Sequence, residues 1–388
     1  MSDILHRFAE HGFVAPNMGQ PHIAHIAPHL WQSLTGGASQ ALPTPDVSNP
    51  WPQSSRVVLI VVDGLGWHNV NDHASAAPFL SELMAGKSPA TTGFPATTAT
   101  SMATIGTGRL AGQTGLVGYS AMNPMTGAVG NFVSWRDVEP PLEIQRETTL
   151  FEQLTAAGVP VTSVSLERFA QSGLTQAAFR GAQHVAAESL DDTVDYTLQA
   201  LREPGLVHMY WGEIDKVGHV HGPHSPQWID ELTSFDQALQ RLMASAPAGT
   251  LCVITADHGM VNIAPRDRID IADDYSLMRG VRAVAGEPRA PQVYTNSPGM
   301  ADQVAQRWAA RLGKRAMVVT RTQAQEAGLL GDVSDHVLPW CGDVLVLTTG
   351  TTAIVDSSTM TPMAIGLRGM HGSLTPYEVH VPLIAATL

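Results

Sequence analysis

The sequence predicts an α/β fold in which a mainly parallel central sheet carries helices on both faces and a small α/β lid is inserted. Strand-like runs of consecutive apolar residues recur along the chain, and helical patterns alternate with them. Strands that are apolar on both faces are typical of parallel sheets covered on both sides by helices. A change of composition over residues 262–342 predicts the lid.

The first predicted strand is RVVLIVVDG, residues 56–64, a β-branched run that ends in Asp-Gly. Similar runs follow at 159–165, 205–212, 249–259 and 343–349. Helical patterns lie at 77–86, 149–158 and 225–246. The first two of these end at a glycine, and the third spaces its apolar residues by three and four. The alternation predicts strands connected by helices.

Three parts of the chain are expected to differ in structure. Residues 1–55 are rich in Pro, His and Gly, which predicts an irregular leader packed on the core. Residues 56–261 and 343–388 would form the catalytic core. Residues 262–342 are richer in Arg and Asp and contain a strand–helix–strand pattern, which predicts the lid subdomain.

Composition limits the possible functions. The chain has 388 residues, of which 44% are hydrophobic and 15% charged, so a sizeable core is expected. Its net charge of −13 argues against binding to nucleic acid or to an anionic membrane. The longest aliphatic run, VVLIVV, is too short to span a membrane, and the N-terminal stretch lacks the apolar core of a signal peptide. We therefore expect a cytoplasmic protein with a small-molecule substrate. The sequence gives no indication of an oligomeric state.

Potential metal ligands follow three of the predicted strands. Asp63 ends the first strand, Asp257 and His258 end another, and Asp215 and His219 follow a third. The carboxyl ends of strands in an open α/β sheet form the ligand crevice, where an unpaired carboxylate is costly. Convergence of these residues predicts a divalent metal site with nitrogen and oxygen ligands. His371, flanked by Met370 and Gly372 in RGMHG, is a further candidate ligand.

A hydroxyl-rich stretch, FPATTATSMATIGTG, spans residues 94–108 and contains the predicted helix start ATSMATIG. A neutral threonine hydroxyl is a poor nucleophile, and this stretch contains no charged residue or histidine that could act as a base, so a hydroxyl that attacks a substrate here would need activation by a metal ion. The start of a helix also favours a bound phosphate.

These motifs, in this order, resemble the alkaline phosphatase superfamily, and in particular its nucleotide pyrophosphatase/phosphodiesterase branch, the type I phosphodiesterases. The motifs are VDG, FPATTAT, TGLVGY, EIDKVGHVHGP, ADHGM and GMHG. The resemblance implies two divalent metal ions, most often Zn²⁺, with Mn²⁺ or Mg²⁺ as alternatives. It assigns one ion to Asp63, Thr98, Asp257 and His258, and the other to Asp215, His219 and His371.

By the same resemblance, Thr98 is the nucleophile, with Thr97 as the alternative if the register shifts by one. The implied function is a two-metal hydrolase of phosphodiester or nucleotide pyrophosphate bonds with a phosphothreonine intermediate. A phosphomonoesterase or phosphomutase is the alternative, followed by a non-catalytic metal- or phosphate-binding protein. At the position of the branch's phosphate-binding Asn, this chain has Tyr119, with Asn123 nearby, and either is a candidate substrate contact. His221 and His224 are also possible contacts, although a place in a loop outside the site is favoured.

Overall fold

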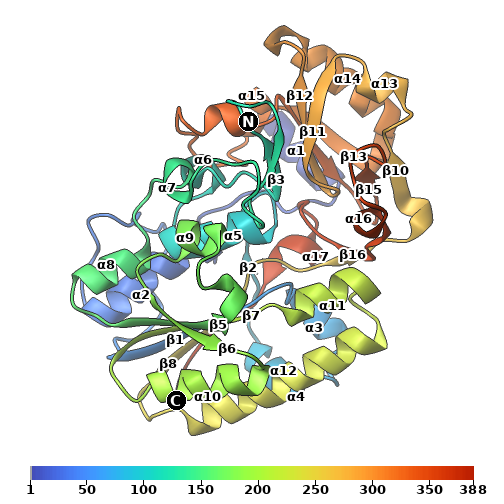
Figure 1. Cartoon of the computed structure of the whole chain (residues 1–388). Coiled ribbons are helices and arrows are strands. Elements are labelled where there is room, and N and C mark those ends of the chain that lie inside the picture. The colour runs from blue at the N-terminus through green and yellow to red at the C-terminus, as the bar shows by residue number, and fades with distance from the viewer. Residues whose placement is uncertain (1) are drawn as a thin grey trace.

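The computed structural model describes residues 2–388, and its centre is a six-stranded sheet with the order β18-β8-β1-β7-β5-β6 (Figure 1). The bounds of its strands, in chain order, are β1 Arg56–Val62, β5 Val161–Leu166, β6 Gln183–Ala187, β7 Gly205–Trp211, β8 Leu251–Ala256 and β18 Leu383–Thr387. Strands β8, β1, β7, β5 and β6 run parallel, and only the edge strand β18 is antiparallel to its neighbour. The predicted fold class, a mainly parallel sheet between helices, is confirmed.

Helices cover both faces of this sheet (Figure 1). On one side α4 Pro78–Met84, α10 Leu190–Ala200 and α12 Pro226–Ser245 pack together. On the other side lie α2 Ile26–Thr35, α5 Thr98–Thr107, α8 Leu150–Ala156 and α9 Gly173–Ala178. Double coverage explains the sequence of β1 and β8, because every residue from Val57 to Val62 and from Leu251 to Ala256 is buried.

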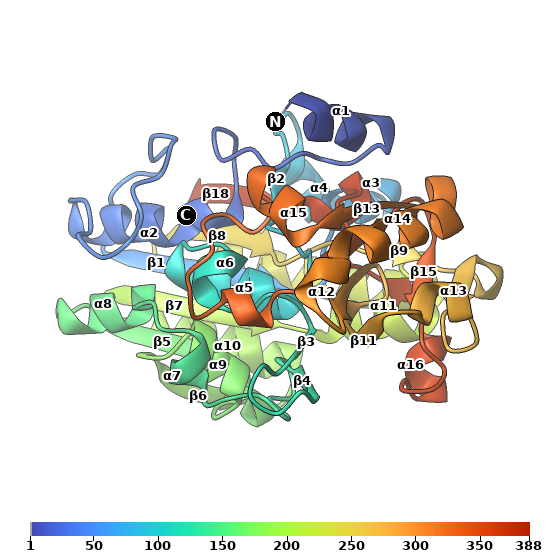
Figure 2. The ribbon, with the colours of Figure 1, turned by 90° about the horizontal axis from the view of Figure 1, so that it is seen from above.

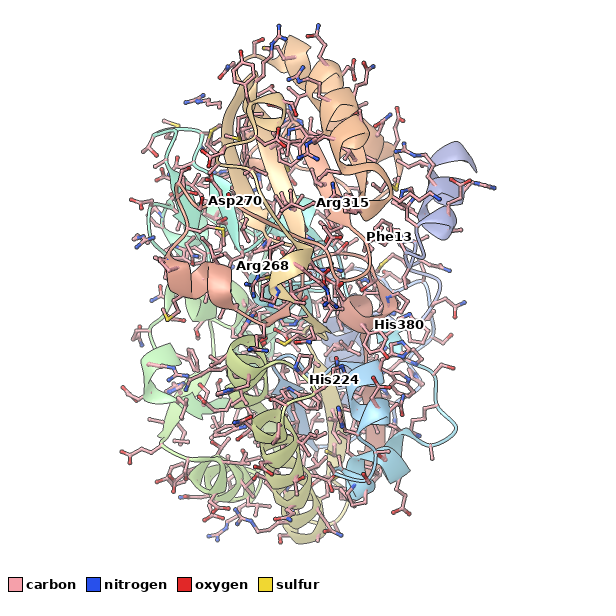
Figure 3. The ribbon with its side chains drawn as sticks, turned by 90° about the vertical axis from the view of Figure 1, so that its right-hand side faces the viewer. Phe13, His224, Arg268, Asp270, Arg315 and His380 are labelled. Atoms are coloured by element: carbon pink, nitrogen blue, oxygen red, sulfur yellow. The ribbon has the colours of Figure 1, made fainter. Side chains whose placement is uncertain are left out.

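A second sheet, with the order β11-β12-β14-β13, forms the other lobe of the molecule. Its strands are β11 Val281–Glu287, β12 Ala290–Thr295, β13 Ala316–Thr320 and β14 Val344–Thr348, and helix α14 Ala301–Leu312 packs on it. Seen from the side, Asp270 and Arg315 lie in this lobe and His224 in the lobe of the central sheet (Figure 3).

The predicted end of the lid at residue 342 is wrong. Strand β14, which was assigned to the catalytic core, pairs with β12 and β13 in the second sheet. Beyond it, β15 Ala353–Val355 pairs with β10 Arg268–Asp270, outside the central sheet. The chain returns to the catalytic site only near β16 Gly369–Met370, which pairs with β9 Val261–Asn262. A buried apolar run such as VLVLT fits either sheet, so its pattern cannot reveal its partner.

The leader is not irregular as predicted, because it contains helices α1 Ser2–Glu10 and α2 (Figure 2). Its helix α2 packs on the core: α2 contacts β1, α5 and α8, and Ile26 and Leu30 are fully buried in the main core. None of the helices in residues 2–388 combines the length and the apolar character needed to cross a membrane.

His22 in the leader makes the stability of the fold depend on pH. Burial, followed by the charge of His25, lowers the pKa of His22 to about 3, and the His22 Nδ1 accepts a hydrogen bond from the Ala24 N–H at 3.0 Å. Below pH 6.5 the unfolded chain binds a proton that the folded chain does not, so His22 lowers stability as the pH falls from 7 towards 3.

We predict that His22→Asn reduces this loss of stability. Asparagine keeps an acceptor for the Ala24 N–H but does not titrate. Between pH 7 and pH 5, the free energy of unfolding of the variant should fall by about 2 kcal/mol less than that of the parent. Urea unfolding at the two pH values measures the difference, and parallel pH dependences for the two proteins would refute the assignment.

Candidate metal centre

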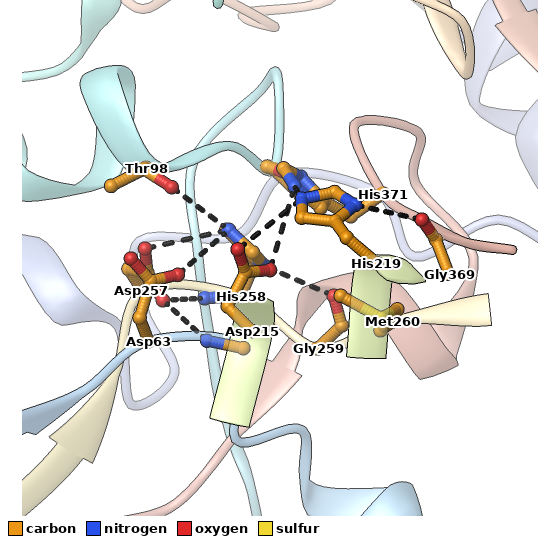
Figure 4. Close-up of polar contacts among 12 residues, drawn as sticks. Asp63, Thr98, Asp215, His219, Asp257, His258, Gly259, Met260, Gly369 and His371 are labelled. Carbon is orange, nitrogen blue, oxygen red and sulfur yellow. Dashed lines mark hydrogen bonds and ion pairs between the residues drawn. The ribbon is translucent and has the colours of Figure 1, made fainter. Parts of the chain in front are cut away.

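The candidate ligands meet at the carboxyl ends of the central strands (Figure 4). Asp63 follows β1, and Asp257 and His258 follow β8. Asp215 and His219 lie on helix α11 Glu213–His221, which begins just after β7, and His371 follows β16. The nucleophile candidate Thr98 is the first residue of α5. Because adjacent parallel strands end at one edge, residues far apart in the sequence come together there.

The first ligand group contains Asp63, Asp257 and His258, each of which offers an atom within 4.8 Å of the others. The His258 Nε2 lies 3.5 Å from the Asp63 Oδ1 and 3.4 Å from the Asp257 Oδ2. The Thr98 hydroxyl is 3.2 Å from the same nitrogen. The structure thus brings together the four residues that the resemblance assigns to one ion.

The second group contains Asp215, His219 and His371, again within 4.8 Å of one another. The Asp215 carboxylate lies 3.2 Å from the His219 Nε2 and 3.9 Å from the His371 Nε2. The two groups adjoin, because the His258 and His371 rings stack with their centroids 3.5 Å apart.

The three histidines are oriented alike by backbone carbonyls. The Nδ1 atoms of His219, His371 and His258 lie 2.8, 2.9 and 3.0 Å from the carbonyl oxygens of Gly369, Ala96 and Gly259, respectively. When Nδ1 donates to a carbonyl, Nε2 keeps its lone pair, which is the arrangement found in histidine metal ligands. The Nε2 atoms of His219 and His371 then face each other at 3.3 Å, and these lone pairs repel unless a cation lies between them.

Two of the carboxylates, those of Asp63 and Asp257, also use one oxygen in hydrogen bonds within the protein and leave the other oxygen without one. Asp257 Oδ1 accepts hydrogen bonds from the N–H groups of Gly64 and His258, each at 3.0 Å. Gly64 has φ +71°, and a Cβ at this position would lie 2.9 Å from the Asp215 Cα, so the approach of the two segments requires glycine. One buried oxygen of each aspartate in the two groups makes no hydrogen bond within residues 2–388, namely Asp63 Oδ1, Asp215 Oδ1 and Asp257 Oδ2.

A positive charge in the site would stabilise its buried carboxylates. Burial, followed by the charges of Asp257 and Asp215, raises the pKa of Asp63 well above its usual value. Burial lowers the pKa of His371 well below its usual value, with a further contribution from His258. Buried carboxylates with free oxygens, next to imidazole Nε2 atoms that face into the same site, form a mixed donor set that fits divalent metal ions. The residues present therefore fit the implied metals.

Of the four residues that were candidates for contact with the substrate, only Tyr119 lines the cavity at the site. Tyr119 is 44% exposed and lines a cavity of about 520 Å³. Residues of both ligand groups, among them Asp63 and Asp215, line the same cavity. Asn123 does not line it, since its side chain bonds to the backbone of Met125, Thr126 and Asp137. His221 and His224 are exposed and do not line the cavity either.

The sequence patterns do not identify two residues of the site, Tyr210 and Glu287. The Tyr210 hydroxyl donates to the Asp63 Oδ2 at 2.5 Å. Glu287, at the end of β11, accepts from the Tyr119 N–H at 2.5 Å, and burial raises its pKa to about 8. Tyr210 could have been found from its place near the end of a strand that precedes predicted ligands. Glu287 lies 168 residues from Tyr119 and carries no local signal.

We predict that Tyr210→Phe weakens metal binding without unfolding the chain. The change removes only the hydrogen bond that orients the Asp63 carboxylate, and partners of this kind typically contribute 10- to 100-fold to metal affinity. Competition with a chromophoric chelator should show a Zn²⁺ affinity lower by about one to two orders of magnitude. An unchanged affinity would show that the hydroxyl has no part in orienting the ligand.

Comparison with known proteins connects this geometry to a family. The model of the family described as type I phosphodiesterase / nucleotide pyrophosphatase matches residues 57–374. Among curated proteins, the catalytic subunit of GPI ethanolamine phosphate transferase 3 from Homo sapiens is 31% identical over 123 residues, which are 29% of this chain and 11% of that protein. The corresponding protein of Mus musculus is 43% identical over 47 residues, 12% of this chain and 4% of that protein. The chain thus spans about a tenth or less of these relatives.

Solved structures share the fold over most of the chain. Murine ectonucleotide pyrophosphatase / phosphodiesterase 5 superposes with a TM-score of 0.68 at 18% identity, covering 85% of this chain and 87% of that one. Phosphonoacetate hydrolase from Sinorhizobium meliloti 1021, in complex with phosphonoformate, superposes with a TM-score of 0.67 at 19% identity, covering 86% and 91%.

Proposed function

The chain belongs to the type I phosphodiesterase / nucleotide pyrophosphatase family, and from this premise we propose that it hydrolyses phosphodiester or nucleotide pyrophosphate bonds with two divalent metal ions. One observation carries the proposal: two ligand groups adjoin each other, and the Thr98 hydroxyl lies 3.2 Å from a ligand nitrogen of the first group. Zn²⁺ is the metal that we propose, because three imidazole nitrogens contribute to the two groups.

Thr98 is suited to act as the nucleophile. Its hydroxyl faces His258, whereas the Thr97 hydroxyl lies beside Glu287 and bonds to none of the described ligand side chains. The N–H groups of the first turn of α5 have no partner within the helix and favour a phosphoryl oxygen there. Bound divalent ions would supply the positive charge that favours the threonine alkoxide and offsets charge on the leaving oxygen.

The proposed reaction has two displacements at phosphorus. In the first, the Thr98 oxygen forms a bond to phosphorus as the bond between phosphorus and the leaving oxygen breaks. The hydroxyl proton is transferred to the departing alcohol or phosphate or to solvent, and the phosphothreonine keeps the other substituent of the substrate phosphorus. In the second, a water oxygen bonds to phosphorus and the bond to Thr98 breaks, which releases the phosphoryl product and restores the hydroxyl. The solved structure of an inactive threonine-to-alanine variant of murine ectonucleotide pyrophosphatase / phosphodiesterase 5 in complex with AMP supports this assignment.

The size of the cavity favours a diester over a monoester. About 520 Å³ exceeds what one phosphoryl group fills, and the lining extends well beyond the ligand groups. We expect Zn²⁺-loaded protein to release nitrophenolate from bis(p-nitrophenyl) phosphate with a higher kcat/KM than from p-nitrophenyl phosphate. Turnover of the monoester alone would instead support a phosphomonoesterase or a phosphomutase.

A further inference from the structure

His371 is the one candidate ligand that follows the second lobe in the chain. The other six lie between residues 63 and 258, at or just after the ends of β1, β7 and β8 or at the start of α5. His371 comes after the strands of the second sheet, and its Nε2 faces the His219 Nε2 across the second ligand group at 3.3 Å (Figure 4). The place of this ligand therefore depends on what holds the segment that carries it.

One buried carboxylate organises residues 371–378, which we call the His371 segment. Glu378 lies in the short helix α17 Pro376–Val379, and its side chain is fully buried. The Glu378 Oε1 accepts a hydrogen bond from the Ser373 N–H at 2.9 Å, and the Oε2 accepts one from the Thr375 hydroxyl at 2.5 Å. The Glu378 side chain thus holds the segment in a folded-back conformation directly after the ligand.

The charged partner of this carboxylate comes from the second lobe. Arg289 lies in the two-residue turn between β11 and β12, and its side chain is fully buried. Its Nε and Nη2 donate to the two oxygens of Glu378 at 3.0 and 2.6 Å, and its Nη1 donates to the Thr352 carbonyl at 2.5 Å. Together with the donors of the His371 segment, the guanidinium gives each carboxylate oxygen two hydrogen bonds.

This ion pair fixes a conformation more than it adds stability. Removing two charges from water offsets most of the attraction between them, so a buried pair contributes little net stability. A planar guanidinium that binds both oxygens of a carboxylate does, however, set its orientation. The side-chain hydrogen bonds of Glu378 within residues 2–388 go to Arg289 or to the His371 segment, so the conformation fixed by the pair is that of the segment.

We propose that Arg289 is a positioning residue for the second ion: through Glu378 it holds the His371 segment so that the His371 Nε2 stays within the second ligand group. The inference rests on the proposed function for the presence of that ion. The first ligand group does not include a residue of the segment. The role of Arg289 therefore concerns one ion and not the other.

Arg289→Lys tests this role through zinc affinity. Lysine keeps a positive charge beside Glu378, but one ammonium cannot reproduce the two parallel bonds of the guanidinium together with its bond to Thr352. Competition with a chromophoric chelator should show the affinity of the second group lowered by about tenfold or more, and that of the first group within about threefold of the parent value. The Asp257→Asn and Asp215→Asn chains, each expected to hold one ion, are the backgrounds in which the second and the first group are measured alone.

Arg180→Lys is the matched control. Arg180 also joins a carboxylate to a backbone carbonyl, since it donates to the Glu152 Oε1 at 2.9 Å and to the Ala177 carbonyl at 3.0 Å, but these residues belong neither to the ligand groups nor to the His371 segment. A change that only loosens the fold at a distance should leave both zinc affinities within about threefold. Equal losses at both groups after Arg289→Lys, or unchanged affinities, would overturn the proposal.

Hydrogen exchange on the metal-free chain tests the same contact without zinc. In Arg289→Lys the Ser373 N–H should exchange about tenfold faster, because its acceptor is no longer held, while the amides of β1 and β8 keep the parent rates. An unchanged rate at Ser373 would also overturn the proposal. If Arg289→Lys does not fold, Thr375→Val, which removes the hydroxyl donor to Glu378, should lower the affinity of the second group by about threefold or more, and an unchanged affinity would refute the role.

Failure of this inference is distinguishable from failure of the proposed function. A parent chain that holds two zinc ions but cleaves no nitrophenyl diester lacks the proposed activity, and the affinity of its second group still tests Arg289. A parent chain that cleaves the diester, with zinc affinities and exchange rates unchanged by Arg289→Lys, has the activity and lacks the role of Arg289. A parent chain that holds no zinc after loading would refute both.

Discussion

Replacing Thr98 by alanine is expected to lower kcat for bis(p-nitrophenyl) phosphate by about three orders of magnitude or more, because the variant lacks the atom that forms the bond to phosphorus. The Thr98 side chain is half-buried at the start of α5, so its loss should leave the fold nearly unchanged. Asp63, Asp257 and His258 remain in the variant, and these three ligands should still hold the first zinc ion. Steady-state release of nitrophenolate measures the effect, with elemental analysis on the same sample.

Thr97→Ala is the matched control, since it removes a hydroxyl from the neighbouring residue. Thr97 is 1% exposed and makes no hydrogen bond to the described ligands, so kcat should stay within about tenfold of the parent value. If Thr98→Ala retained its turnover and Thr97→Ala lost it, the nucleophile would be Thr97. Undiminished turnover in both variants would remove a threonine nucleophile from the mechanism.

The second large effect is expected from replacing one carboxylate in each of the two ligand groups, Asp215 or Asp257. Asp215→Asn and Asp257→Asn each keep the size of the side chain but remove a negative ligand, so each should reduce bound zinc from about two ions per chain to about one. Both variants should lose most of their turnover, by about a hundredfold or more, because the proposed reaction places the phosphorus between the two groups.

Elemental analysis after equilibrium dialysis measures the zinc content. Asp230→Asn, which changes an exposed carboxylate on α12, is the control and should keep both ions. Two zinc ions per chain in Asp215→Asn or in Asp257→Asn would show that the corresponding group does not hold an ion. A parent chain without zinc after loading would contradict the proposed metal use as a whole.

The central sheet and the position of the candidate ligands at its strand ends can be predicted from the sequence for one physical reason. Strands buried on both faces are apolar over their whole length, so a polar residue such as Asp63 or Asp257 stands out where the strand ends. The topology then gathers these ends at one edge. For these residues, the local sequence pattern and the place in the fold lead to the same prediction.

The lid boundary, the leader helices and the residues behind the ligands depend on contacts that local patterns do not specify. Strand β14 is as apolar as a core strand, but its partners lie in the second sheet. Helix α2 packs on β1 and α5, and such packing supplies most of the stability of a short helix. Glu287 reaches Tyr119 only because the second sheet closes over the site.

An anomalous-difference map from crystals of the Zn²⁺-loaded protein, recorded on both sides of the zinc absorption edge, tests the two-metal account most directly. The account predicts two peaks, one among Asp63, Thr98, Asp257 and His258, and the other among Asp215, His219 and His371. A single peak, or peaks away from these side chains, would contradict it.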